Sequence, residues 1–563
     1  MSSQVINALR RLGILAALLG ILGTIAGTPA VADSYTPIAG AGSTWAENAI
    51  DQWRRDVNKN GMRISYAGGG SSDGRRQFLS GTVDFAVSDI PFQTHPTDGS
   101  AAERPAKGSY AYMPIVAGGT VFMYHLTVNG KRVTNLRLSG DVVTKIFTGV
   151  VKTWDDPVIK ADNPGLQLPH RTIVPVVRSD GSGSTAQFTM WMVNQHRALW
   201  NAYCAKVGRA GSCGQTSYYP TVSGMIAQSG DLGVAGYVAQ NYGEGAIGYV
   251  NYSYARNAHY PVAKVLNHAG YYTEPTPQNV AVSLLKARIN TDKNSADYLT
   301  QQLDGVYNDS DKRNYPLSSY SYMILPLKVQ GTFTEAKGKT LGAFSYYFMC
   351  QGQQQAPGLG YSPLPINLVQ AGFDQIRRIP GVHAQNINIR NCNNPTFTTT
   401  GQNRLAQTAP YPAACDKEGA APCTTGSGGA TASSGNGSGG SSGGSTGATG
   451  TGTAGGGSGP AGGNSAQPSV DPDTGQTISP GGTTGSASGG TGAGADGTVA
   501  LAQPVAVATA HGWTGTQTLM LLAAVLVLGL LLLPSVISRL VGGRAGGNRN
   551  SNGNGRFEDG SSR

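Results

Sequence analysis

Strand-like stretches alternate with stretches of helical spacing along most of the first 390 residues of the chain. Residues 64–67 and 83–88 have the alternating or continuous apolar character of short strands. Residues 45–53 and 186–192 place apolar side chains at the spacing of one helix face. Because strands that alternate with helices are typical of a mixed α/β fold, the pattern predicts one.

Three predicted helices, at residues 45–53, 75–79 and 186–192, follow turns that are rich in Gly, Ser and Thr. The turns lie at residues 40–44, 68–74 and 178–185, and a strand or extended segment precedes each one. The first turn of a helix has unpaired backbone N–H groups and a partial positive charge, so it attracts anions. One such unit is weak evidence, whereas three in one domain indicate helix N-termini that converge on one anion.

Two charged residues indicate which kind of anion fits. Arg178 lies in the third turn, and its planar donors suit an oxyanion. Asp89 ends the strand-like segment 83–89, and an ionised Asp can only accept hydrogen bonds. A buried Asp would therefore accept a hydrogen bond from HPO4 or H2PO4 and repel fully ionised sulfate. The sequence thus predicts a site for a protonated oxyanion.

Seven short motifs occur in an order that is specific to one family. They are GAGST at 40–44, GGGSSDG at 68–74, VDFAVSD at 83–89, TWDD at 153–156, NPG at 163–165, RSDGSGST at 178–185 and GAIGYV at 245–250. Together they resemble the phosphate-binding proteins of phosphate-specific ABC importers, over roughly residues 35–390. The resemblance implies a two-lobed periplasmic-binding-protein fold whose cleft closes over phosphate. It also implies a membrane permease and an ATPase as partners.

The resemblance further implies which residues hold the phosphate. Carried over residue by residue, the contacts are Thr44, the backbone N–H of Trp45, Ser71, Asp89, Arg178, Ser182, Gly183 and Ser184, with Asp180 supporting Arg178. Trp45 stands where the family usually has Phe, and Ser184 where Thr is common. Neither difference changes the charge of the site. No catalytic residue, metal ligand or cofactor is expected.

We expect the binding domain to span residues 33–415 and to consist of two lobes. Lobe one would combine residues 35–115 with 251–390, and lobe two would be the inserted residues 116–250. The cleft with the phosphate site would lie between the lobes.

The two ends of the chain predict export and anchoring. Residues 1–32 have the basic start, apolar run and small-residue cleavage site of a signal peptide. Residues 416–510 are mostly Gly, Ser, Thr and Ala and predict a disordered linker. Residues 518–537 are apolar and long enough to cross a bilayer, and the basic tail 538–563 would stay cytoplasmic. The binding domain would then lie outside the cell, anchored to the cell membrane by the C-terminal helix.

The six cysteines favour disulfides, because their number is even and the chain is expected to be exported. Sequence proximity suggests the pairs Cys204–Cys213, Cys350–Cys392 and Cys415–Cys423, although the sequence alone leaves other pairings open. A zinc site is the alternative, but no pair has the short C-x-x-C type of spacing.

Three classes of function remain open from the sequence. A transport receptor explains the export signal, the cleft motifs and the tether together. A phosphatase that uses Ser182 or Asp89 is disfavoured, since neither a metal site nor an activated nucleophile is visible. A surface-sensing or adhesive protein with the same fold fits export and tether equally well. The net charge is +10, but an exported chain without a basic and aromatic platform is not expected to bind nucleic acid.

Overall fold

The protein is described here by a computed structural model of residues 35–209, 213–389, 392, 394–398 and 400–430, with two short strands further along the chain. The chain divides into two compact units, residues 1–442 and 443–563. In the second unit, β16 (Ser469–Val470) pairs antiparallel with β17 (Thr477–Ile478).

The signal peptide at 1–32 and the membrane helix at 518–537 that the sequence predicts lie outside the described residues. Within the described part of the chain, no helix is both long and apolar enough to span a bilayer.

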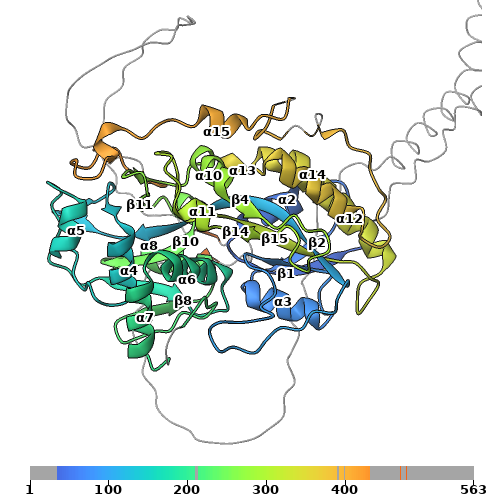
Figure 1. Ribbon diagram of the computed structural model, residues 1–563, viewed down its shortest axis with the longest axis horizontal. Helices are drawn as coiled ribbons and strands as arrows, with labels where there is room; N and C mark the ends of the chain where they lie inside the picture. Colours follow the sequence, from blue (N-terminus) through green and yellow to red (C-terminus); the bar gives the residue numbers. More distant parts are fainter. Residues whose placement is uncertain are drawn as a thin grey trace, which may run out of the picture. The chain divides into compact units, whose positions relative to one another are not determined.

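The first unit alternates strands and helices along its length (Figure 1). Its strands are β1 (Ile38–Gly42), β2 (Ile64–Ala67), β3 (Phe85–Ser88), β4 (Tyr110–Tyr124), β5 (Thr127–Val128), β6 (Lys131–Arg132), β7 (Arg137–Leu138), β8 (Val174–Arg178), β9 (Ile226–Gln228), β10 (Ala246–Asn251), β11 (Val262–Leu266), β12 (Tyr272–Thr273), β13 (Arg288–Ile289), β14 (Gln301–Gln302) and β15 (Ser318–Pro326). Its α-helices are α2 (Glu47–Asn58), α3 (Ser71–Leu79), α4 (Gly140–Phe147), α5 (Pro157–Asp162), α6 (Gly183–Gln195), α7 (Arg197–Lys206), α8 (Gly230–Ala239), α9 (Tyr252–Asn257), α10 (Pro277–Ser283), α11 (Asp304–Tyr307), α12 (Glu335–Cys350), α13 (Ala356–Leu359), α14 (Ile366–Ile376) and α15 (Arg404–Thr408). The predicted mixed α/β class is confirmed.

One sheet connects most of these strands. Its main path has the order β2-β1-β3-β15-β4-β10-β8-β9. Two groups of parallel strands, β2-β1-β3 and β10-β8-β9, lie at the ends of this path. The antiparallel strands β15 and β4 join them. Since carboxyl ends of parallel strands are where α/β proteins place their ligands, each group offers one wall of a site.

Strand β4 joins the two halves of the sheet through its length. It pairs with β15 through residues 110–119 and with β10 through residues 120–124. All 15 of its residues are buried. The chain therefore passes from one half of the unit to the other within a single strand.

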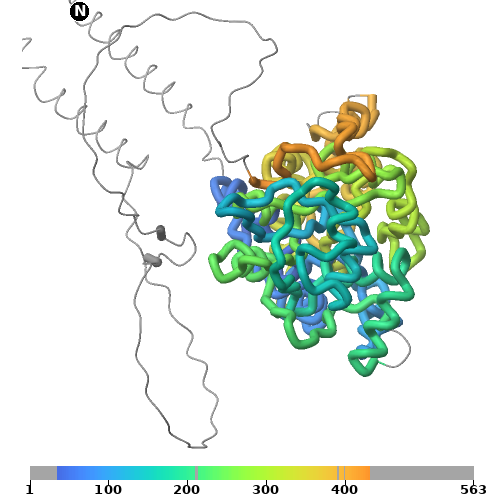
Figure 2. The backbone as a smooth tube through the Cα atoms, turned by 90° about the vertical axis from the view of Figure 1, so that its left-hand side faces the viewer, coloured from blue at the N-terminus to red at the C-terminus, as the bar shows by residue number. Residues whose placement is uncertain are grey.

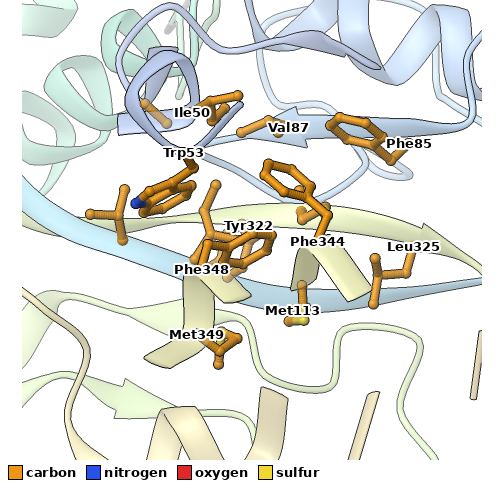
Figure 3. Close-up of a cluster of buried hydrophobic side chains, with 14 of the residues drawn as sticks. Ile50, Trp53, Phe85, Val87, Met113, Tyr322, Leu325, Phe344, Phe348 and Met349 are labelled. Atoms are coloured by element: carbon orange, nitrogen blue, oxygen red, sulfur yellow. The ribbon is translucent and has the colours of Figure 1, made fainter. Parts of the chain in front are cut away.

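Two large hydrophobic clusters form most of the core of the described residues, and a third, small one is made by alanines and a valine of α10 and the α15 region. The first gathers buried side chains from residues 38–117 and 320–397 (Figure 3). In it, the rings of Trp53 and Phe348 stack with their centroids 4.8 Å apart. The second gathers side chains from residues 121–265 and 303–317. The lobe boundaries given by the sequence stay a prediction, but several residues after 250 pack in the second cluster.

Three disulfides link the pairs that sequence proximity favours. They are Cys204–Cys213, Cys350–Cys392 and Cys415–Cys423. The second bond joins the end of α12 to the segment that leads toward α15.

Residues 416–430 differ from the linker that composition predicts from residue 416. The Ser427 hydroxyl donates to the carbonyl of Thr134 at 3.1 Å, and Nδ2 of Asn135 donates to the carbonyl of Cys423 at 2.7 Å. The buried guanidinium of Arg137 donates to the carbonyl of Ala420 at 2.6 Å and to that of the preceding Cys415 at 2.7 Å. This closing segment, orange in Figures 1 and 2, therefore packs on the domain because its carbonyls satisfy buried donors.

Candidate functional site

The three strand–turn–helix units predicted from the sequence are present. β1 leads into α2, β2 into α3 and β8 into α6. Gly70, directly before α3, has a φ of 92°, a conformation that glycine adopts without steric cost. A Cβ added at Gly70 would meet Oδ2 of Asp180 at 2.4 Å. The turn before α3 therefore lies against the turn that follows β8.

Asp89 follows β3 and is 3% exposed. Its carboxylate accepts hydrogen bonds from the hydroxyls of Ser43 at 2.8 and 2.9 Å, of Ser71 at 3.2 Å, and of Ser321. Burial raises the pKa of Asp89, the hydroxyls of Ser321 and Ser43 oppose the rise, and the charge of Asp231 adds to it. Three donors aimed at one carboxyl group are the arrangement that an acceptor-only carboxylate requires.

Arg178 ends β8 and is 2% exposed. Its Nε and Nη2 donate to the carboxylate of Asp180, with Nε 2.8 Å from Oδ1. Its Nη1 donates to Asp231, and Nη2 also donates to the Thr44 hydroxyl at 2.8 Å. Burial acts to lower the pKa of Arg178, but the charges of Asp231 and Asp180 raise it above its ordinary value. The guanidinium is therefore a permanent cation held from three sides.

The Thr44 hydroxyl connects the two walls of the site. It accepts hydrogen bonds from Arg178 and from the backbone N–H of Asp231, the latter at 3.1 Å, and it donates to Oδ2 of Asp231 at 2.6 Å. A hydroxyl has one proton and two lone pairs, so all of its hydrogen-bonding capacity is used. In this conformation Thr44 bonds to protein groups, and its contact with phosphate stays a prediction.

The start of α6 presents donors toward the same place. Ser182 caps the helix, and its Oγ accepts from the N–H of Thr185 at 3.1 Å. The first bond of the helix runs from Ala186 N to Ser182 O, so the N–H groups of Gly183 and Ser184 precede it. The Ser184 hydroxyl is buried and has no hydrogen-bond partner among the described residues. A buried hydroxyl without a partner is costly in a structure that binds nothing, and it is a ready contact for a ligand.

Direct contacts close the two walls on each other. The N–H of Ser72 donates to the carbonyl of Gly181 at 2.9 Å, and Nε2 of Gln187 donates to the carbonyl of Asp89 at 2.8 Å. A Cβ added at Gly183 would lie 2.4 Å from Oγ of Ser71 and 2.5 Å from Oδ2 of Asp89. The described conformation is therefore a closed one, and only glycine fits at position 183.

The structure brings together the residues that the sequence singles out. All eight expected contact residues are buried, and Asp180 is half-buried beside Arg178. Trp45 donates its backbone N–H to Oγ of Ser43 at 3.1 Å, while its indole donates to Thr120 and packs edge-on against Tyr361. Their roles as phosphate contacts remain a prediction.

Three further residues belong to this network and were missed by the sequence reasoning. Ser43 and Ser321 donate hydrogen bonds to Asp89, and Asp231 accepts one from Arg178. Ser43 lies inside a motif that was recognised, and Asp231 follows a Ser-Gly pair at a helix start, which is a readable signal. Ser321 lies in a buried strand with no local signal.

A cavity of about 420 Å³ borders the closed site. It is lined by residues of both walls, among them Ser72, Arg76, Ala186, Ser217 and Tyr218. Ser72 thus bonds to Gly181 inside the site and faces the cavity outside it.

The paired acidic residues Asp155 and Asp156 have structural roles. Asp156 caps α5, with its Oδ1 accepting from the N–H of Val158 at 3.0 Å, and Asp155 bonds to His170.

Comparison with known proteins supplies the class. The family model of the PBP superfamily domain matches residues 27–351. A protein of Xylella fastidiosa (strain Temecula1) named phosphate-binding protein PstS is 31% identical over 334 residues, which cover 59% of this chain and 83% of that protein. One of Methanocaldococcus jannaschii with the same name is 28% identical over 353 residues, which cover 60% of this chain and 85% of that protein. A solved high affinity periplasmic phosphate-binding protein, PfluDING, is 17% identical, with 62% of this chain and 100% of that chain covered and a TM-score of 0.45.

The mixed α/β domain places helix starts, a fixed cation and an acceptor carboxylate in one closed site. Together with the family match, this arrangement defines the chain as a substrate-binding protein. The chain belongs to the PBP superfamily and, within it, to the family of phosphate-binding proteins PstS. This is a family of substrate-binding proteins rather than of enzymes.

Proposed function

We propose that this chain captures inorganic phosphate outside the cytoplasm and delivers it to an ABC importer. The observation that supports this most directly is the unpartnered Ser184 hydroxyl, buried at the start of α6. It follows Gly183, where an added Cβ would lie 2.5 Å from Oδ2 of the acceptor carboxylate Asp89, and the fixed cation Arg178 belongs to the same network. These three groups match an oxyanion that both accepts and donates hydrogen bonds.

The proposed contacts divide into donors and one acceptor. The donors are Arg178, the hydroxyls of Ser71, Ser182 and Ser184, and the backbone N–H groups of Trp45, Gly183 and Ser184 at the helix starts. Thr44 would join them after its bond to Asp231 is exchanged, and Ser71 and Trp45 would likewise exchange their present bonds to Asp89 and Ser43 for bonds to phosphate. Phosphate then replaces protein–protein hydrogen bonds rather than filling apolar space, so selectivity rests on matching donors and acceptors.

Asp89 supplies the selectivity against sulfate. Its carboxylate can bind an oxyanion only through a proton that the ligand carries, and sulfate carries none at neutral pH. Sulfate at this position would place an unprotonated oxygen against a buried carboxylate, which is strongly unfavourable.

The proposed setting is extracytoplasmic. The supports are the family, the signal-like residues 1–32 and the apolar residues 518–537. In this proposal the C-terminal helix anchors the domain to the cell membrane, and a permease and an ATPase of other chains complete the importer. A tether raises the effective concentration of the loaded domain at the permease. No catalytic step, cofactor or metal takes part in it.

Exchange of Asp89 for Asn tests the acceptor role. Asp89→Asn supplies an N–H in place of one oxygen, so sulfate should bind measurably to the variant while phosphate affinity falls. Asp84→Asn is the matched control, because Asp84 is equally buried at the other end of β3 but bonds to Ala39 N and Lys337. Calorimetric titration with both anions measures the ratio. An unchanged preference for phosphate in Asp89→Asn, with the fold intact, contradicts the role of Asp89.

A further inference from the structure

A second cavity of about 420 Å³ lies in the first unit, and none of the expected phosphate contacts lines it. Its walls come from residues 94–112, from residues 293–298 and from residues 375–378 at the end of α14. Its volume lies within the range of about 300–1,000 Å³ that is usual for small-molecule sites. We call it the basic cavity because of the side chains that line it, chiefly Arg104, Lys107, Lys293, Arg378, Gln375 and Tyr298.

Four cations from separate parts of the chain meet at the basic cavity. Arg104 and Lys107 belong to one wall, Lys293 to another and Arg378 to the end of α14. None of the four forms an ion pair with a carboxylate among the described residues. Unpaired cations that line one concave surface attract an anion.

The acidic residue in the same lining does not neutralise these cations. Both carboxylate oxygens of Glu103 accept from Nε of the buried Arg75, at 3.0 and 2.9 Å. One of them also accepts from the N–H of Gln93 at 2.6 Å. Asp297 lies in the wall 293–298, but it is not among the residues that line the cavity. The basic cavity therefore keeps an excess of positive charge.

A buried amide at the basic cavity adds an unused donor. Gln375 is 2% exposed, and its Oε1 accepts from Nη1 of Arg378 at 2.6 Å. Because this bond assigns the oxygen, Nε2 is the opposite end of the amide. Nε2 makes no hydrogen bond within the part of the chain that the structure describes. A buried donor without a partner is costly unless a ligand or water accepts from it.

Tyrosine rings form an apolar part of the lining. The rings of Tyr110 and Tyr112 lie edge to face with their centroids 5.4 Å apart, and the Tyr112 hydroxyl accepts from the N–H of Phe92 at 2.7 Å. These contacts hold both rings in place, and the half-buried Tyr298 lines the cavity from the segment 293–298. Fixed aromatic rings beside cations suit a ligand that combines a ring with negative charge.

We propose that the basic cavity is a second binding site, and that its ligand is a phosphorylated ring compound, either a sugar phosphate or a nucleotide. A phosphomonoester carries about two negative charges at neutral pH, so it matches four unpaired cations better than a single carboxylate does. Arg104 and Arg378 bind the phosphate oxygens through their planar donors, Nε2 of Gln375 donates to the ligand, and the ring packs on the tyrosines. This site goes beyond the proposed function and does not depend on it, since none of the expected phosphate contacts lines the cavity.

Calorimetric titration of the full chain tests the proposal, with inorganic phosphate in excess over the protein. The probes are AMP and glucose 6-phosphate, each compared with its unphosphorylated ring compound, adenosine or glucose. AMP, glucose 6-phosphate or both should bind one-to-one with a Kd below about 1 mM. The unphosphorylated compound should bind at least about tenfold more weakly than its phosphate. The tighter of the two phosphorylated probes identifies the kind of ring.

Paired substitutions assign the binding to the basic cavity. Arg104→Gln combined with Lys293→Gln removes one cation from each of two walls and should weaken binding of the probe by at least about tenfold. Arg377→Gln is the matched control, because Arg377 neighbours Arg378 but pairs with Asp374 at 2.9 Å and does not line the cavity. The control should bind the probe as the wild type does. Both variants should keep the wild-type affinity for inorganic phosphate.

Four results would overturn the proposal. They are no binding of either phosphorylated probe to the folded chain, loss of probe binding when inorganic phosphate is added, equal binding of a probe and its unphosphorylated ring compound, and unchanged probe affinity in the double variant. Equal losses of affinity in the double variant and in Arg377→Gln would also overturn it, because a general loss of surface charge would then explain the result. A folded chain that binds a probe at the basic cavity but binds no inorganic phosphate would instead contradict only the proposed function.

Discussion

Replacing Ser184 by Ala should affect phosphate affinity and the free energy of unfolding in different ways. In the described conformation this hydroxyl is buried and without a partner. Ser184→Ala therefore removes no hydrogen bond from the protein itself. Since Ala also has a higher helix propensity than Ser, by roughly 0.5 kcal/mol, the variant should be as stable as the wild type or slightly more stable.

The effect on binding should have the opposite sign. A hydrogen bond from a hydroxyl to a charged acceptor contributes about 1.5–3 kcal/mol. Its loss lowers phosphate affinity by about tenfold to about a hundredfold. Stability and affinity should thus change in opposite directions in a single variant.

Ser345→Ala is the matched control for this experiment. Ser345 also lies in a helix, α12, and its hydroxyl is likewise buried without a partner among the described residues. It lies in α12 next to Phe344, a residue of the first hydrophobic cluster, and not at the start of α6. Ser345→Ala should therefore resemble Ser184→Ala in stability and the wild type in phosphate affinity.

Calorimetric titration with phosphate and urea denaturation without phosphate give the two quantities for each variant. Wild-type affinity in Ser184→Ala would refute the reasoning, because a hydroxyl that contacts the ligand cannot be lost without cost. Equal losses of affinity in both variants would also refute it, since a general effect of the substitutions would then explain the result.

Three more changes test separate parts of the structure. Gly183→Ala places a Cβ 2.4 Å from Oγ of Ser71, so closure should become less favourable by about 1–3 kcal/mol and phosphate affinity should fall. The control is Gly236→Ala, whose added Cβ meets nothing within 4 Å and which should leave the phosphate affinity measured by calorimetry unchanged. Equal phosphate affinities of the two variants would contradict the closed geometry. Burial raises the pKa of Glu47 from 4.5 to about 7, so the folded state binds the Glu47 proton more tightly than the unfolded state does. Stability should therefore fall by about 3 kcal/mol as the pH rises through this window, and urea denaturation should show no such loss for Glu47→Gln. The bond Cys350–Cys392 joins residues 42 apart, so replacing both by Ser should cost about 2–4 kcal/mol, and an unchanged denaturation midpoint would show that the bond adds no stability.

Local sequence carries enough information to locate most of the proposed site. Each helix start is marked by Gly, Ser or Thr after a strand, and the structure has helices beginning at Ser71 and Gly183, a few residues earlier than the predicted turns 68–74 and 178–185 end. These signals are local, because capping and turn formation depend on a few neighbouring residues.

Contacts between distant segments could not be derived in the same way. Asp231 is 187 positions from Thr44, and Ser321 is 232 positions from Asp89. Nothing in the two sequences around such residues specifies that they meet, because the sheet order that joins them is a property of the whole fold. The expected role of Thr44 illustrates this, since its hydroxyl proves to be engaged by Asp231 and Arg178 in the closed form.

Composition also misplaced one boundary. Residues 416–430 contain Gly, Ser and Ala like the segment after them. They nevertheless pack on the domain, because Arg137 and Asn135 donate to the carbonyls of Ala420 and Cys423 and the Cys415–Cys423 bond constrains the segment. Composition predicts the absence of a hydrophobic core but not the presence of hydrogen-bond partners elsewhere.

Calorimetric titration of the oxidised full chain, stripped of bound anions, with phosphate and, in a separate sample, with sulfate tests whether this chain is a phosphate receptor. Phosphate should bind one-to-one, and sulfate should give no heat of binding to the anion-free protein. A folded chain that binds neither anion, or that binds sulfate as tightly as phosphate, would contradict it.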